Sequence, residues 1–293
     1  MFHKIFLVFL VSLSNSFGVS LVFDYTYDTG NFFTAERRSV VTLAAQSFSS
    51  LAINRGAMTP GGINSWNWYV PNPSDFGEEI TLANPTIGAG EIRVFLGAQN
   101  LGGGTLGQGG SVGYDASGNQ AWIDLINSTN TTLAYKPFAG VISLDTTTTW
   151  YSGTEPTVTP GAFDMYSVMA HELGHVLGFG LYGGADAWTA NTDALNHTFT
   201  GTAASVAYGG PLPLATDNAH IAAGTQFGGE TMIMVAALPT GTRRHWTIPE
   251  LESLVDLGYV AVPEPSVVCF FFGALFVFAL QKMRRRVSLP HEA

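Results

Sequence analysis

Two histidines and a glutamate lie within five residues of one another, at His171, Glu172 and His175. On an α-helix, residues four apart project about 40° from each other and lie one turn apart, so both imidazoles can bind one metal ion. Glu172 lies at the edge of the same face, where its carboxylate can take a proton from a metal-activated water. Neutral imidazoles are typical ligands of Zn²⁺, which lowers the pKa of a bound water to about 7. The spacing therefore predicts a catalytic zinc site.

The segment AFDMYSVMAHELGHVLGFG, residues 162–180, is predicted to be the helix that carries this site. Asp164 is the candidate N-cap, and Gly178 is the expected helix stop. The alternative is a helix whose histidines are hydrogen-bonded core residues without a metal. Two imidazoles and a carboxylate on one buried face need polar partners, which favours the metal site.

This segment resembles the HExxHxxG signature of metzincin zinc metalloproteases, in which a glycine turns the chain out of the helix. Most metzincins place a third metal ligand three residues after that glycine. Here Leu181 stands at that position, and its side chain cannot bind a metal. The third ligand must therefore lie elsewhere if the site is intact.

His220 is the predicted third ligand. It lies in DNAHIAAGTQFGGETMIM, which resembles leishmanolysin-like metzincins, where an insertion separates the helix from a distant third histidine. In that family a methionine follows and forms a hydrophobic base beneath the metal. The resemblance assigns this place to Met232, with Met234 as the alternate.

Four other side chains are alternative third ligands. His245 follows two arginines, a cluster that indicates a solvated loop or a substrate contact. His197 is interpreted as a surface residue. Asp186 and Asp193 are candidate carboxylate ligands without supporting context.

The first residues are predicted to be a secretory signal peptide, residues 1–18. Lys4 precedes the apolar run Ile5–Leu13, which is too short to span a bilayer, and small residues allow cleavage after Gly18. The alternative is a buried edge strand. Position and charge order favour export.

The last residues, 261–293, resemble the PEP-CTERM sorting tail of exported bacterial proteins. Pro263-Glu264-Pro265 precedes an apolar segment, 267–280, and a basic cluster follows. As a helix the apolar segment reaches ~21 Å, less than the ~30 Å hydrocarbon core. The basic cluster places that end in the cytoplasm. The resemblance implies processing by an exosortase and delivery to the envelope or the extracellular space; the alternative is a permanent membrane anchor.

Charge and cysteine content narrow the function of the body, residues 19–260. It carries 7 of the 12 Lys and Arg residues and 20 of the 22 Asp and Glu residues, a formal charge of −13, which argues against nucleic-acid binding. The only cysteine is Cys269, in the tail. The body can form no disulfide, and the cysteine-based latency of matrixins is excluded.

The body is predicted to be one α+β domain, with an upper part at 19–180 and a lower part at 181–260. The resemblance implies a metzincin-like catalytic domain with a mixed twisted sheet. Strands are expected at 21–28, 65–70, 91–98 and 140–145, and helices over 34–53, 162–180 and 247–259, the last with a capping box of Thr247 and Glu250.

Two stretches of the body lack a regular pattern. The glycine-rich run at 96–118 is expected to be a loop or a bulged edge strand, because it lacks the context of a phosphate loop. Asp115 in this run is a weak candidate for calcium binding. Residues 181–246 are expected to be mostly irregular.

The expected function is that of a secreted zinc endopeptidase that acts on protein or peptide substrates. The strand before the helix with the two histidines, 140–145, is expected to bind substrate, with the substrate pairing beside it as an added strand. Candidates for an oxyanion stabiliser are Tyr208, Arg243 and His245. One alternative is a non-catalytic exported matrix protein, which would not need Glu172; another is a zinc hydrolase of a different amide, such as that of peptidoglycan.

Overall fold

A computed structural model describes residues 19–181 and 183–262. The predicted signal peptide, 1–18, and the apolar tail segment, 267–280, lie outside these residues. The folded body extends slightly past its expected end, since Val260–Ala261 (β16) pairs with Leu51–Ala52 (β2). None of the helices in the described part of the chain has the length and apolar character that a bilayer crossing requires.

A four-stranded mixed sheet positions the helix that carries His171 and His175. Its order is β1-β5-β8-β6, formed by Ser20–Asp24, Glu91–Gln99, Ala139–Asp145 and Gly107–Ser111. The first three strands run parallel, whereas β6 is antiparallel to β8. Every residue of β8 is buried, as expected for a strand covered on both faces. The first strand is shorter than predicted, because Asp24 begins a turn and its carboxylate accepts from Thr26 N.

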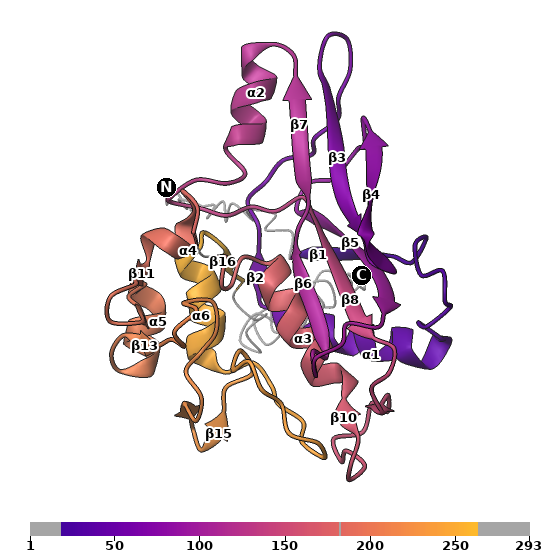
Figure 1. The fold of residues 1–293 in the computed structure, drawn as a ribbon. Helices are drawn as coiled ribbons and strands as arrows, with labels where there is room; N and C mark the ends of the chain where they lie inside the picture. Colours follow the sequence, from indigo (N-terminus) through magenta and orange to yellow (C-terminus); the bar gives the residue numbers. More distant parts are fainter. Residues whose placement is uncertain (1–18, 182, 263–293) are drawn as a thin grey trace, which may run out of the picture.

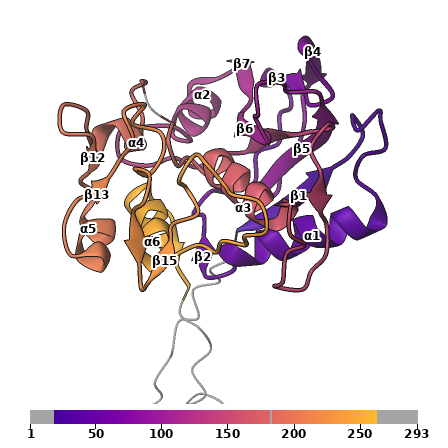
Figure 2. The same cartoon turned by 60° about the horizontal axis from the view of Figure 1, so that its bottom comes forward.

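Two helices pack beside this sheet. Helix α1, Ala35–Ala45, begins at the predicted N-cap Thr34, and a 3-10 turn, Gln46–Phe48 (η1), follows it. Helix α3, Met165–Val176, lies against β6 and β8 and also contacts α1. In Figure 1 and Figure 2, α3 lies between the strands and the C-terminal helices.

A second sheet of three antiparallel strands has the order β4-β3-β7, formed by Asp75–Ala83, Ser65–Asn72 and Gly113–Ser117. Helix α2, Gln120–Asn127, follows β7. Trp66, Trp68 and Phe138 anchor the separate aromatic core beneath this sheet. The predictions missed β4 and α2. The glycine-rich run proved to contain two strands, β6 and β7, in agreement with the edge-strand alternative for β6.

The C-terminal part is built of short elements separated by irregular chain. The expectation of a mostly irregular chain over 181–246 therefore agrees with the structure apart from these short elements. The elements from residue 150 onward, apart from α3 and β16, are β9 Trp150–Tyr151, β10 Phe163–Asp164, α4 Ala187–Ala190, β11 Thr192–Asp193, β12 Thr198–Phe199, α5 Thr202–Tyr208, β13 Leu212–Pro213, β14 Gln226–Phe227, β15 Glu230–Thr231 and α6 Ile248–Asp256. Helix α6 begins with the predicted capping box of Thr247 and Glu250. It packs against α5.

One large hydrophobic core joins the upper and lower parts of the body. It includes Val40 on α1, Leu173 on α3 and Leu254 on α6. The chain therefore has an α+β fold in which helix α3 is central, and residues from both parts surround that helix.

Candidate metal centre

Helix α3 begins and ends where the sequence predicted. Asp164 caps it, since its carboxylate accepts from Ser167 N at 3.1 Å and from Ser167 Oγ at 2.6 Å. At the other end Gly178 has φ +107°, and Phe179 N donates to Gly174 O at 2.9 Å, which closes the last turn. Gly178 thus turns the chain out of the helix directly after the second histidine.

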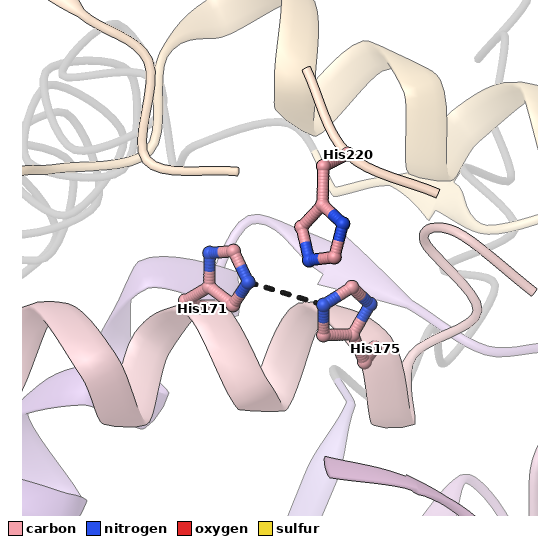
Figure 3. A group of neighbouring side chains, drawn as sticks. All are labelled: His171, His175 and His220. Carbon is pink, nitrogen blue, oxygen red and sulfur yellow. Dashed lines mark hydrogen bonds between the residues drawn. The ribbon is translucent and has the colours of Figure 1, made fainter. Parts of the chain in front are cut away.

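The three predicted ligands come together. One ligand atom from each of His171, His175 and His220 lies within 4.8 Å of the other two. The Nε2 atoms of His171 and His175 are 3.1 Å apart, close to the about 3.3 Å that tetrahedral zinc with bonds of about 2.0 Å requires. Figure 3 shows that His220 points toward the two helix histidines from the opposite side.

The Nδ1 atom of each imidazole is already used. The bonds run from His171 to Ile233 O at 2.9 Å, from His175 to Phe179 O at 2.8 Å and from His220 to Asp217 Oδ2 at 2.7 Å. Because carbonyl and carboxylate oxygens can only accept, each Nδ1 carries a proton, and in the neutral ring the lone pair is on Nε2. All three rings are therefore held in the tautomer that a metal needs.

The electrostatics of the two helix histidines favour the ligand form. Burial, followed by the neighbouring imidazole of His175, holds the pKa of His171 well below its ordinary value. Burial and the imidazole of His220 lower the pKa of His175 to about 4. Both rings are neutral at pH 7, and a metal does not have to displace protons from them.

Glu172 lies in the same site and is nearly inaccessible to solvent. Burial raises the pKa of its carboxyl to about 8, and a hydrogen bond from the backbone N–H of Gly109 opposes that shift. A carboxyl group with a pKa near neutral can both take and return a proton.

Strand β6 reaches α3 closely because it carries glycines at the contact. A Cβ on Gly107 would lie 2.9 Å from Oε1 of Glu172, and a Cβ on Gly109 would lie 2.6 Å from the carbonyl oxygen of Glu172. The predictions missed this role of the glycine-rich run. The available signal was the glycine at every second position, which places both glycines on one face of a strand.

An open cleft of about 620 Å³ runs past these groups. The cleft is lined by the three histidines, Glu172, the 103–109 segment, part of α3 and the 235–238 segment. Within the described residues β6 pairs only with β8, so its second edge faces no strand. Strand β8 is paired on both edges, and the expectation that 140–145 receives an added strand is therefore wrong; β6 is the edge strand.

The two methionines after His220 are both buried. The sulfur of Met234 lies 2.9 Å from the position that a Cβ on Gly174, the residue before His175, would occupy. Met234, the alternate, thus packs against helix α3 at this point, and Met232 stays the prediction for the hydrophobic base beneath the metal.

The alternative third ligands have other partners. Nδ1 of His245 is 3.0 Å from the hydroxyl of Tyr166. His197 is half-buried rather than a surface residue, and its Nδ1 is 2.8 Å from Asn218 Oδ1. Both carboxylates accept hydrogen bonds from nearby backbone N–H groups. Asp186 accepts from Thr189 N, and Asp193 accepts from Leu195 N and Asn196 N.

Arg243 does not lie in a solvated loop. Its guanidinium donates to both carboxylate oxygens of Asp164, at 2.7 and 3.0 Å, and its side chain is 5% exposed. The interpretation of residues 243–245 as a solvated cluster is wrong for this residue, because the buried N-cap of α3 supplies its counter-charge. Neither Arg243 nor His245 lines the cleft, and neither does Tyr208.

Asp115 receives hydrogen bonds from Tyr69 Oη at 2.7 Å and from Asn67 N at 3.2 Å. Among residues 19–181 and 183–262, the three histidines are the one group of three or more His, Cys, Asp or Glu side chains close enough to hold a metal. Asp115 belongs to no such group.

Comparison with protein-family models and with curated proteins finds no match to this chain. The function of the site is therefore inferred from its own geometry.

Proposed function

We propose that this chain is a zinc-dependent endopeptidase of the metzincin type. The observation that supports this most is the convergence of three imidazole rings in an open cleft that the buried Glu172 also lines. Structural zinc sites are usually closed by four protein ligands, whereas catalytic sites have three and keep one position open. The group found among the described residues offers three.

The chemistry divides between the ion and the chain. A bound zinc ion would supply Lewis acidity, which lowers the pKa of water and polarises a carbonyl group. Glu172 would accept a proton from the attacking water and then give it to the leaving amine. A cation nearby favours the carboxylate form, so it would offset part of the rise in the pKa of Glu172 that burial causes.

The cleft is suited to an extended peptide. The unpaired edge of β6 can form main-chain hydrogen bonds to such a peptide, as in β-strand addition. The cleft is also lined by residues 235–238, Phe163 and Val168, whose apolar side chains can contact the side chains of the substrate.

The proposal includes export. The predicted signal peptide, 1–18, would direct the chain out of the cytoplasm, and the tail would anchor it in the inner membrane, transiently if an exosortase removes the tail. The strongly acidic body makes a nucleic-acid partner unfavourable.

The test is zinc content and proteolysis of an unfolded protein substrate, measured for the purified wild-type chain and three variants. Glu172→Gln should keep zinc and lose about 10²- to 10⁴-fold in rate, because only the proton transfer is removed. His220→Ala should lose zinc. His245→Ala, a histidine outside the cleft, should match wild type in both measurements.

Two results would contradict the proposal. A wild-type chain that binds no zinc would favour a non-catalytic matrix protein that keeps the fold. A Glu172→Gln variant as active as wild type would show that the observed cleavage does not come from this site.

A further inference from the structure

The Ile233–Met234 segment contacts the surroundings of all three histidines. Ile233 O accepts from Nδ1 of His171 at 2.9 Å. The side chain of Met234 packs at Gly174, the residue before His175. Met234 O accepts from Ile221 N, the residue after His220, at 2.9 Å. The position of this segment therefore affects every ligand.

Glu250 accepts a hydrogen bond from the backbone of this segment. Its carboxylate, on the first turn of α6, is fully buried, and Oε1 accepts from Met234 N at 2.8 Å. The C=O of Ile233 and the N–H of Met234 belong to one peptide group. Glu250 and His171 are thus joined through a single peptide, with the carboxylate on its N–H and the imidazole on its C=O.

The hydrogen bond from Met234 N to Oε1 of Glu250 is not part of the capping box. In a capping box the glutamate accepts from the backbone N–H of the N-cap residue. Here Oε2 does so, from Thr247 N at 3.0 Å, and it also accepts from Thr247 Oγ1 at 2.7 Å. Oε2 therefore caps α6, whereas Oε1 binds the backbone of the Ile233–Met234 segment.

We propose that Glu250 is a positioning residue for the metal centre, acting on His171 through the Ile233–Met234 peptide. This inference rests on the proposed zinc site. A carboxylate on the N–H polarises the peptide and makes its C=O a stronger acceptor, which fixes the ring of His171 and its tautomer. Loss of such an outer partner typically costs ~10- to 100-fold in metal affinity.

The test compares zinc dissociation constants and cobalt-substituted absorption spectra of the full chain. Glu250→Gln must turn its NH₂ group toward either Met234 N–H or the donors of Thr247, and it is expected to weaken zinc binding ~10- to 100-fold and to change the cobalt spectrum. Glu252→Gln, the same change two residues further along α6, is expected to match wild type. Thr247→Val removes the hydroxyl that donates to Oε2 but keeps the bond from Met234 N to Oε1, so it should lower stability and affect zinc affinity less than Glu250→Gln does.

Equal zinc affinity and an equal cobalt spectrum for Glu250→Gln and wild type would overturn the inference, even if the variant is less stable, because the carboxylate would then serve α6 alone. If Glu250→Gln does not fold, Glu250→Asp decides the question. That variant keeps the charge but shortens the reach to Met234 N, and weaker zinc binding is again expected. A wild-type chain that binds no metal would instead refute the proposed function itself.

Discussion

The three histidines of the candidate zinc site are oriented in two different ways. His171 and His175 donate to the main-chain carbonyls of Ile233 and Phe179, which are both buried residues. His220 donates to a side chain, the carboxylate of Asp217, which is 49% exposed. At the residue scale, the orientation of His220 therefore depends on one loop aspartate.

Replacing Asp217 with Asn should weaken zinc binding by ~10- to 100-fold. Oδ1 of Asp217 accepts from Ala219 N and His220 N, so an amide that keeps this oxygen in place turns its NH₂ toward Nδ1–H of His220. Competition with a chromophoric chelator measures the change. Asp193→Asn, which alters an aspartate outside the group of three histidines, is the control, and equal affinities of the two variants would refute this role.

In the metal-free protein, the buried Glu172 should lower the unfolding free energy at pH values above the ordinary pKa of a glutamate. Its folded pKa is raised from 4.5 to about 8, so the folded state binds the proton more tightly than the unfolded state. The stabilisation is complete below pH 4.5 and is lost as the pH rises through 8. Metal-free Glu172→Gln should therefore exceed wild type in unfolding free energy at pH 8 by an amount on the order of 4 kcal/mol.

Urea unfolding of both proteins at pH 5 and pH 8, in the presence of a chelator, measures this difference. It should be small at pH 5 and larger at pH 8. A difference that does not grow with pH would show that the carboxyl group titrates in the folded state as it does in the unfolded state.

At this scale the sequence was informative because the chemistry requires fixed spacings. The two helix histidines, Glu172 and the caps of α3 all follow from local geometry. The partner of each Nδ1 could not be predicted, since a backbone carbonyl such as Ile233 O leaves no trace in residue type. Asp217 was the exception, because it precedes His220 by three residues.

At the scale of elements, the contact of β6 with α3 depends on glycine. A Cβ on Gly109 would meet the backbone of Glu172 at 2.6 Å, whereas a Cβ on Gly110, the next residue, would meet nothing within 4 Å. The two residues are therefore a matched pair within one strand.

Gly109→Ala is expected to lower the unfolding free energy by about 1–3 kcal/mol and to reduce activity, because β6 must move away from α3. Gly110→Ala should stay within about 0.5 kcal/mol of wild type. Urea unfolding and peptide cleavage measure both effects. Equal behaviour of the two variants would mean that β6 does not need the close approach.

The segment before α6 is tied to the first turn of α3 by a buried ion pair between Arg243 and Asp164. Removing one partner of a buried pair leaves the other charge uncompensated. We therefore expect Arg243→Met to lower the unfolding free energy by about 3–5 kcal/mol.

The control is Arg93→Met, which removes a partner from the half-exposed pair with Glu91, separated by 3.6 Å. Its cost should be about 0–1 kcal/mol. Thermal or urea denaturation compares the two variants, and a cost for Arg243→Met no greater than that for Arg93→Met would contradict the assigned role.

Elements with a strong local pattern were predictable, and elements defined by pairing were not. Strand β4 carries adjacent glutamates and is largely exposed, so only its antiparallel pairing with β3 makes it a strand. Helix α2 did have a local signal, since Asn119 caps it and the buried Trp122 and Ile126 are four residues apart. The glycine-rich β6 is a strand because β8 and α3 hold it.

At the scale of the molecule, the site joins the two parts of the body. Residues 183–219 contain short elements between the second and third histidines, and the chain returns where Ala219 O lies against Gly180. Gly180 has φ +76° and leaves no room for a Cβ at this contact. The α+β class and the displaced histidine could be predicted, whereas the path of this insertion could not, because it depends on long-range contacts.

The central claim is that one zinc ion binds to His171, His175 and His220 with a fourth position open. Zinc-edge X-ray absorption of the purified chain tests this most directly. We expect three imidazole nitrogens and one further light atom at about 2.0 Å, and one imidazole fewer in any His220→Ala protein that retains zinc. An unchanged imidazole count in that variant, or a wild-type chain without bound zinc, would contradict the account.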